Sequence, residues 1–303
     1  MINKLKDNSS SKSYLNELNN IYYSLNDVIP INNYTILSDI GISYPGAEIS
    51  SLQNLSGNIY LTDPKLQYVY SISDTTQSTP TQFERLSSGI SIPQSITYSL
   101  SKNSLFLYDT DRGLFSVALN GTLSPIIGPV PNSNISSIQS YMGNIYMLDS
   151  SKGIIYNVNT TTLSYTNGLK SKYLVGARSF AVDGNIFVID KSGNIVRFYA
   201  NTYTPFAISN SQAMEYSLNK SSYIYDNQYS NYIYIVDPAH YRIVVLQKPA
   251  AGSVNTTDYK FVKQYVYTGS NKSLFSNITD LSISASGKSF YLLSGTKIIK
   301  IFI

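Results

Sequence analysis

One unit recurs along this chain: a short apolar strand that ends in Asp, a tight turn, and a second apolar strand. The segments GNIYLTDPKLQYVYSI and GNIYMLDSSKGIIYNV show it most clearly. A sixth copy, GKSFYLLSGTKIIKIF, has Ser where the other five have Asp. The six anchor residues are Asp63, Asp109, Asp149, Asp190, Asp237 and Ser294. They lie 40 to 57 residues apart, and a period of this length with β-branched and aromatic runs is typical of propeller blades.

The repeat predicts an all-β chain, a six-bladed β-propeller of four-stranded antiparallel blades that occupies residues 31–303. Apolar segments upstream of the anchors supply the innermost strands, and weaker segments downstream supply the outer strands. In blade five the innermost strand is expected at 214–218, and in blade four the outer strand is expected at 203–208. A chain of 303 residues is long enough for one closed β-domain.

The last blade is predicted to lack its own outer strand, because Ile303 directly follows the third strand. An open edge as apolar as KIIKIFI would invite aggregation, so we expect an N-terminal strand to close the ring. Residues 33–37 (NYTIL) are the expected closing strand, with 21–25 (IYYSL) as the alternative. Residues 1–30 are expected to form an arm outside the ring, partly extended or bound to a partner.

The Asp anchors have two possible roles. Asp suits a tight turn, since its carboxylate accepts a backbone N–H two residues further on. A ring of carboxylates also suggests calcium, but residues in separate blades are too far apart to share one ion. We therefore interpret the five residues Asp63, Asp109, Asp149, Asp190 and Asp237 as structural turn caps, and we expect no metal site and no cofactor.

Composition argues against most catalytic sites. The chain has no cysteine and one histidine, His240, so cysteine nucleophiles, zinc–thiolate sites and sites with two His ligands are excluded. A Ser-His-Asp arrangement could form only around His240, which the repeat places in a turn of blade five. Glu48 and Glu215, at the starts of expected innermost strands, are the carboxylates that a calcium-dependent enzyme could bring to the central channel. We expect that the chain is not an enzyme.

Charge and hydropathy exclude two classes of partner. The 22 basic residues are spread thinly over a chain of net charge +4, without the Lys/Arg run that a nucleic-acid partner requires. Nowhere do 18 apolar residues run together, so no membrane span is expected.

The chain has 28 tyrosines, and six of them lie between Ser222 and Tyr241. Tyr mixed with Asn and Ser is the composition of surfaces that bind protein or sugar. The candidate interaction residues are Tyr223, Tyr225, Tyr229, Tyr232 and Tyr241. The expected partners are other protein subunits, docked in part by the N-terminal arm, or a glycan.

Only 13% of the residues are charged, about half the usual share, and Ser, Thr and Asn replace them. Hydroxyls and amides do not titrate as pH falls, which suits an acidic or extracellular setting. The N-terminal sequence MINKLKDNSSSKSYLNELNN has no apolar stretch of signal-peptide length. An exterior composition without an export signal is the basis of the hypothesis that the protein is released by assembly into a virus particle.

The repeats resemble the NHL family of six-bladed propellers and, more distantly, the YWTD and sugar-lactone-lyase-like propellers. The strands GNIYMLD and GNIFVID look like the NHL strand "G-N-hydrophobic-Y-V-x-D", and DPAHYRIVVL looks like the segment that follows it, with Arg242 in the expected place and Arg112 as a looser counterpart. The resemblance covers roughly residues 45–303. It implies a platform for protein, RNA or ligand, and in a minority of related rings a calcium-dependent hydrolase or lyase.

Three functions are consistent with these observations. The leading hypothesis is a non-enzymatic structural or interaction propeller on the exterior of a virion or surface appendage, from an acid-dwelling thermophilic source. The second is a calcium-dependent lactonase or lyase with its substrate in the channel. The third is an intracellular, cytoplasmic scaffold for another protein.

Overall fold

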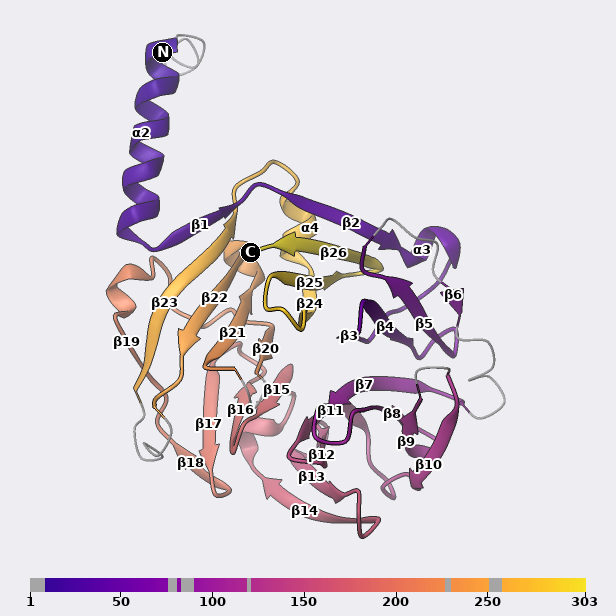
Figure 1. The fold of residues 1–303 in the computed structure, drawn as a ribbon. Coiled ribbons are helices and arrows are strands. Elements are labelled where there is room, and N and C mark those ends of the chain that lie inside the picture. The colour runs from indigo at the N-terminus through magenta and orange to yellow at the C-terminus, as the bar shows by residue number, and fades with distance from the viewer. Residues whose placement is uncertain (1–8, 76–80, 83–89, 119–120, 227–229, 251–257) are drawn as a thin grey trace.

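Each copy of the repeat forms the second and third strands of one sheet, and the six sheets are arranged around a common axis (Figure 1). This computed structural model describes residues 9–75, 81–82, 90–118, 121–226, 230–250 and 258–303. The architecture is the predicted six-bladed β-propeller of four-stranded antiparallel blades.

The first four blades each follow the chain from the channel outward. Blade one holds β3 (Ser51–Leu55), β4 (Asn58–Asp63), β5 (Tyr68–Ser73) and β6 (Thr81–Gln82). Blade two holds β7 (Pro93–Ser99), β8 (Ser104–Asp109), β9 (Gly113–Val117) and β10 (Leu123–Ile127). Blade three holds β11 (Ile135–Tyr141), β12 (Asn144–Asp149), β13 (Ile154–Asn159) and β14 (Ser164–Lys170). Blade four holds β15 (Ser179–Val182), β16 (Asn185–Ile189), β17 (Ile195–Tyr199) and β18 (Thr202–Thr204).

The last two blades recruit strands from elsewhere in the chain. Blade five holds β20 (Tyr223–Tyr225), β21 (Tyr232–Asp237), β22 (Arg242–Gln247) and β23 (Asp258–Tyr267), and both β1 (Val28–Ile31) and β19 (Ala207–Ser209) pair in parallel with β23. Blade six holds β24 (Ile278–Ile283), β25 (Ser289–Ser294), β26 (Lys297–Phe302) and β2 (Tyr34–Asp39). Short helices in the connections are α3 (Ile40–Ser43), α4 (Lys272–Ser276), η2 (Lys172–Leu174), η3 (Ser211–Ala213) and η4 (Pro238–His240).

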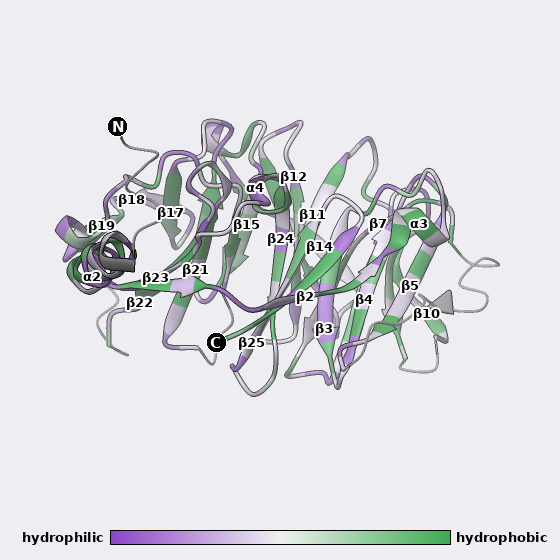
Figure 2. Cartoon of the chain, turned by 90° about the horizontal axis from the view of Figure 1, so that it is seen from above, coloured by the Kyte–Doolittle hydropathy of each residue, from purple (hydrophilic) through white to green (hydrophobic). Residues whose placement is uncertain are grey.

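The core lies between neighbouring blades, where the flat faces of the sheets pack together. Between blades five and six, for example, Val245, Leu292 and Ile299 belong to one buried cluster. Viewed edge-on, the disc carries its apolar residues along the strands and many of its polar residues in the loops of the two faces (Figure 2). Burial of these strands on both faces explains why they read as near-continuous apolar runs.

An N-terminal strand closes the ring, as predicted. Strand β2 pairs antiparallel with β26, with Tyr34 opposite Ile301 and Asp39 opposite Lys297. The carboxylate of Asp39 locks the end of this pairing, since it accepts from Thr296 Oγ1 at 2.6 Å and contacts Lys297 Nζ at 2.7 Å. Burial raises the pKa of Asp39, but these bonds and the Lys297 charge outweigh that effect, so the pKa is lowered overall.

The arm is helical where it was expected to be partly extended. Helix α2 (Ser9–Leu25) includes the alternative closing strand 21–25, and it leaves the rim of the disc beside blade five (Figures 1 and 2). The prediction missed this helix because Ser and Asn are poor helix formers, although its apolar residues have a helical spacing. No helix among the described residues is long and apolar enough to cross a membrane.

Two strand predictions were wrong. The innermost strand of blade five is Tyr223–Tyr225, whereas 214–218 forms part of the connection that follows η3. The expected outer strand 203–208 is divided between β18 in blade four and β19 in blade five. Pro205 lies between them, and a proline lacks the N–H that a continuous ladder needs.

Candidate functional site

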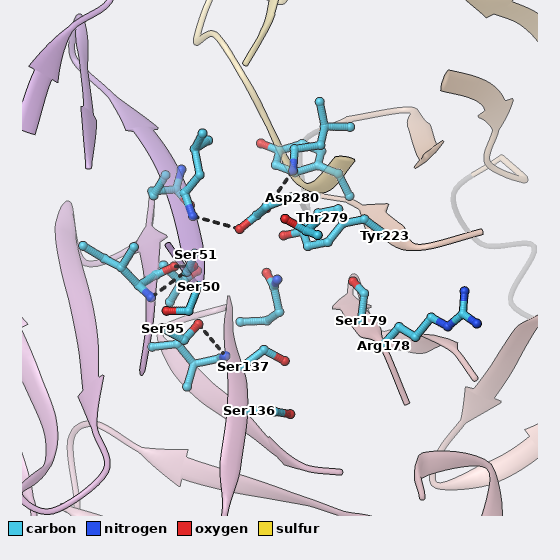
Figure 3. A pocket seen from close by; sticks show the side chains of 18 residues that line it. Ser50, Ser51, Ser95, Ser136, Ser137, Arg178, Ser179, Tyr223, Thr279 and Asp280 are labelled. Atoms are coloured by element: carbon cyan, nitrogen blue, oxygen red, sulfur yellow. Dashed lines mark hydrogen bonds between the residues drawn. The ribbon is translucent and has the colours of Figure 1, made fainter. Parts of the chain in front are cut away.

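Six equivalent positions, one on each innermost strand, form a polar ring around the central channel (Figure 3). The ring, called here the channel ring, consists of Ser51, Ser95, Ser137, Ser179, Tyr223 and Asp280. Each member is followed by a residue that points into the hydrophobic core, such as Leu52 after Ser51 or Ile96 after Ser95. Alternation along a strand therefore directs one side chain of every blade toward the axis.

Most members of the channel ring join one blade to the next. The side chain accepts a hydrogen bond from a backbone N–H on the innermost strand of the following blade. The pairs are Ser51 with Ile96 N at 3.3 Å, Ser95 with Ile138 N at 3.2 Å, Ser179 with Ile224 N at 3.3 Å and Asp280 with Leu52 N at 2.8 Å. These inner strands have neighbours in adjacent blades but no ladder between them, so the side chains satisfy N–H groups that would otherwise be buried without a partner.

Asp280 is the carboxyl of the channel ring and lies at the junction between the last and first blades. Besides Leu52 N, it accepts from Leu281 N at 2.7 Å and from the hydroxyls of Tyr223 and Ser51. Burial raises the pKa of Asp280 to about 7, and the hydrogen bonds oppose that shift only in part. A carboxyl with this pKa exchanges its proton near neutrality, as a general acid or base must.

Tyr223 is the aromatic member of the channel ring. Burial and the adjacent Asp280 raise the pKa of its hydroxyl well above the ordinary value for tyrosine. The phenol therefore stays protonated and donates to Asp280. Gln139, from β11, also bonds to the Tyr223 hydroxyl, so this group links blades three, five and six.

The channel cavity is small. Its volume is about 80 Å³, which holds roughly five to eight water molecules at about 10–15 Å³ each. Pockets for drug-sized ligands are larger, at roughly 300–1,000 Å³. Arg178 lies at its edge and donates to the carbonyls of Ser221 at 3.1 Å and Lys191 at 2.9 Å. In this conformation the cavity accommodates water or a very small polar molecule.

The cavity residues do not fit a calcium ion. Calcium takes six to eight oxygen ligands, usually with several carboxylates, and Asp280 is the only carboxyl among the described residues that line the cavity. The two acids that sequence reasoning placed at the channel lie elsewhere: Glu48 pairs with Lys65, and Glu215 accepts a hydrogen bond from Tyr22. Both are exposed.

Four Asp anchors accept from backbone N–H groups of the turns that follow them. Asp63 accepts from Lys65 N at 3.1 Å and Leu66 N at 3.0 Å, and Asp109, Asp149 and Asp190 make bonds of the same kind. Three of them also accept from the loop that enters their own blade: Asp63 from Glu48 N, Asp109 from Ile92 N and Asp149 from Asn134 N. Each of these three carboxylates thus fixes two loops on one face of the disc, whereas Asp190 fixes only its own turn.

The remaining anchors differ from this pattern. The side chain of Asp237 accepts no capping hydrogen bond from the backbone of η4. Instead, its Oδ2 contacts Arg242 Nε at 2.9 Å and His240 Nδ1 at 2.8 Å. Ser294 holds the anchor position of blade six and donates to the carbonyl of Leu274 at 2.6 Å, because a hydroxyl carries the proton that a carboxylate lacks.

His240 lies in a turn of blade five, as predicted, and stacks on Tyr216 with ring centroids 4.1 Å apart. Arg242, the position that carries the NHL resemblance, is buried and also donates to Gln264 Oε1 at 2.8 Å and to the carbonyl of Tyr216 at 2.7 Å. These groups hold blade five together around the buried Asp237.

The structure does not bring the four candidate tyrosines that it describes onto one surface. Tyr223 and Tyr225 line the channel, Tyr232 is exposed at the start of β21, and Tyr241 is half-buried beneath Lys272, whose Nζ lies 4.9 Å from the ring centroid. Tyr229 lies outside the described residues.

Sequence reasoning missed two carboxyl sites. Asp280 occupies the ring position that Ser holds in four blades, so aligning the innermost strands by that position would have revealed it. The second is a buried cluster in which Lys248 Nζ contacts Asp183 at 3.1 Å and also pairs with Asp226. Burial, together with the charge of Asp183, raises the pKa of Asp226 well above its ordinary value. No local signal marks this cluster.

Comparison with solved structures finds the same fold in proteins of diverse activity. A gluconolactonase from Xanthomonas campestris aligns with a TM-score of 0.61 and 7% identity over 90% of this chain and 91% of its own. Virginiamycin B lyase from Staphylococcus aureus gives 0.57 and 11% over 89% and 98%, and the WD40 propeller domain of Doa1 gives 0.55 and 10% over 90% and 97%. At these identities the likeness shows the propeller fold alone.

No protein-family model and no curated protein matches the sequence. The resemblance to the NHL family therefore stays a prediction. The chain is a β-propeller with structural neighbours that include a lyase, a lactonase and an interaction domain.

Proposed function

We propose that this protein is a non-enzymatic interaction propeller that serves as a subunit of a larger protein assembly on the exterior of a virion or surface appendage. The observation that carries the proposal is helix α2, which extends beyond the rim of the disc (Figure 1). The bonds that hold it are at its C-terminal end, where Tyr22 donates to Glu215 and Gln264 Nε2 donates to the carbonyl of Asn26 at 3.0 Å.

The ring itself supports the same proposal. Four of the six channel-ring side chains join one blade to the next. The low-charge exterior of Ser, Thr and Asn suits a protein exposed to changing pH. The predicted NHL likeness agrees, since that family supplies platforms for other macromolecules. A nucleic-acid partner is not proposed, because basic residues are sparse.

Fractionation of the source culture tests the proposal. Virus particles, surface appendages and cytosol are purified separately, and the protein is quantified in each by mass spectrometry. We expect it in particles or appendages at a stoichiometry comparable with other structural subunits. Recovery only from the cytosol would contradict an exterior role and favour the intracellular scaffold.

An enzyme of the lactonase or lyase kind is the second candidate, favoured by one observation: the Asp280–Tyr223 pair places a carboxyl of pKa about 7 in the channel. Titration of the protein with calcium by calorimetry, followed by a lactone-hydrolysis assay with and without calcium, separates the two candidates. We expect neither saturable binding nor turnover. A tight calcium site, or turnover abolished by Asp280→Asn, would overturn the non-enzymatic proposal.

A further inference from the structure

Helix α2 carries an uncovered apolar seam, defined here as Tyr14, Leu18, Ile21 and Leu25. These residues follow one another at intervals of four, three and four, the spacing of alternating d and a positions in a heptad repeat. Their exposed fractions run from 51% to 71%, so the ring covers none of them well. Tyr22, whose hydroxyl reaches Glu215, lies beside the seam and leaves it free.

The intrinsic stability of α2 is low. Eleven of its 17 residues are Ser, Asn or Tyr, and it has no acidic residue in its first turn and no basic residue in its last. An isolated helix shorter than about 12–15 residues is marginal in water even when rich in alanine, and α2 is only slightly longer and consists of poorer helix formers. The bonds to the propeller hold only its C-terminal end. Packing of the seam against a partner would supply the missing stability.

We propose that α2 pairs antiparallel with α2 of a second copy of this chain, seam against seam. The inference rests on the proposed assembly function and names the partner. A two-fold axis between Asn19 and Asn20 places Tyr14 opposite Leu25 of the second copy, and Leu18 opposite Ile21. The seam is therefore complementary to itself, as a symmetric dimer requires.

Charge does not oppose this pairing. The helix carries one Lys and one Glu, Lys12 and Glu17, and neither lies in the seam. A partner of a different kind would be expected to match a strongly charged flank, and α2 offers none. An apolar stripe within a nearly neutral Ser/Asn surface is best matched by an identical stripe.

The antiparallel orientation follows from where the rings are attached. Each helix ends on its own disc, and a domain of this length is roughly 40–50 Å across, whereas paired helices lie about 8–10 Å apart. Parallel pairing would crowd two discs at one end. Antiparallel pairing separates them by the helix length of about 25 Å and also opposes the two helix dipoles.

Cysteine cross-linking tests the orientation cleanly, because the chain has no cysteine of its own. Under mild oxidation the double variant Tyr14→Cys/Leu25→Cys should give a disulfide-linked dimer on a non-reducing gel. The single variant Tyr14→Cys should not, since its two thiols would lie about 16 Å apart along the pair. A dimer from the single variant would show a parallel pair and overturn the inference, as would no dimer from the double variant.

Sedimentation equilibrium tests the seam. The wild-type chain should dimerise, and Leu18→Asn/Ile21→Asn should weaken the dimer at least about 100-fold through the loss of buried apolar surface. The matched control Asn16→Gln/Asn20→Gln changes the opposite face and should leave the dimer intact. Equal weakening in both variants, or a monomeric wild type, would overturn the inference. Both variants should keep the β-sheet circular dichroism of the ring.

A negative result here remains distinct from failure of the proposed function. If the wild type is monomeric but the seam variant is no longer incorporated into particles, α2 binds another subunit, and the assembly role stands while the second-copy inference falls. If incorporation also survives the seam variant, the observation that carries the assembly role is lost as well.

Discussion

Among individual side chains, Asp237 has the most demanding environment of the Asp anchors. Its carboxylate is fully buried, and its partner Arg242 is buried as well. Burying two charges is costly unless each stays paired, so the loss of one partner leaves the other charge buried and unpaired. Asp190, by contrast, is a half-buried anchor that accepts from Ser192 N at 2.8 Å and Asn194 N at 3.0 Å.

We therefore expect unequal costs for the same substitution at two equivalent positions. Asp237→Ala should lower the free energy of unfolding by about 3–5 kcal/mol, and Asp190→Ala by about 1 kcal/mol, measured by urea denaturation. The double variant Asp237→Ala/Arg242→Met should recover much of the lost free energy of unfolding, since it also removes the buried, unpaired charge of Arg242. Similar costs at both positions would show that Asp237 acts as an ordinary turn cap.

Among the strands, β2 has the role that the sequence predicted for an N-terminal closing segment. It covers the apolar edge of β26, and Leu37 is buried between the first and last blades. Removing residues 1–32 deletes α2 and β1 but leaves β2, whereas removing 1–39 deletes β2 as well.

The shorter deletion removes the pairing of β1 with β23 and the buried side chains of Val28 and Ile31, so it should lower the free energy of unfolding, measured by urea denaturation, by only about 1–2 kcal/mol. The longer one should lower the free energy of unfolding by about 3–5 kcal/mol and promote aggregation through the exposed edge. A synthetic peptide of residues 31–41 added to the longer deletion should restore solubility. Equal stability of the two variants would mean that closure depends on β1 rather than β2.

How far the sequence predicted the molecule depends on how local each feature is. The strand–Asp–turn unit is local and periodic, so the blades and the closing strand could be predicted from it. The position of Asp280 could be found by aligning the innermost strands, but its contacts could not be predicted, because Leu52 and Tyr223 come from blades one and five and only ring closure brings them together. The cluster of Asp183 and Lys248 likewise joins segments 65 residues apart. The helix of the arm was not predicted, because its apolar residues have a helical spacing but its many Ser and Asn residues are poor helix formers.

For the molecule as a whole, buried carboxyls set how stability changes with pH. Burial raises the pKa of Asp280 to about 7 and raises that of Asp226 well above its ordinary value. A carboxyl whose pKa is raised on folding binds its proton more tightly in the folded state, so its stabilising effect is complete below the unfolded value of 3.8. That effect is lost as pH rises toward 7. Asp39, whose pKa is lowered, acts in the opposite sense and loses stability in acid.

The ring should therefore be more stable in mildly acidic than in weakly alkaline solution, which agrees with the acidic setting expected from its low charge. A rise of about three units at Asp280 corresponds to a loss on the order of 3–4 kcal/mol in the free energy of unfolding between pH 4 and pH 8. Asp280→Asn removes the titrating proton and keeps one acceptor oxygen. The variant should be less stable than wild type at pH 4 and should equal or exceed it at pH 8.

Urea unfolding at several pH values between 4 and 8 measures this slope. Asp27→Asn is the matched control, since Asp27 is exposed and Asn also tolerates its positive φ of 47°; it should leave the slope unchanged. If Asp280→Asn retains the wild-type slope, the pH dependence arises elsewhere, and the buried pair Asp226 and Asp183 becomes the group to substitute. If the slope disappears, the carboxyl that joins the last blade to the first also sets the pH range in which the ring holds together.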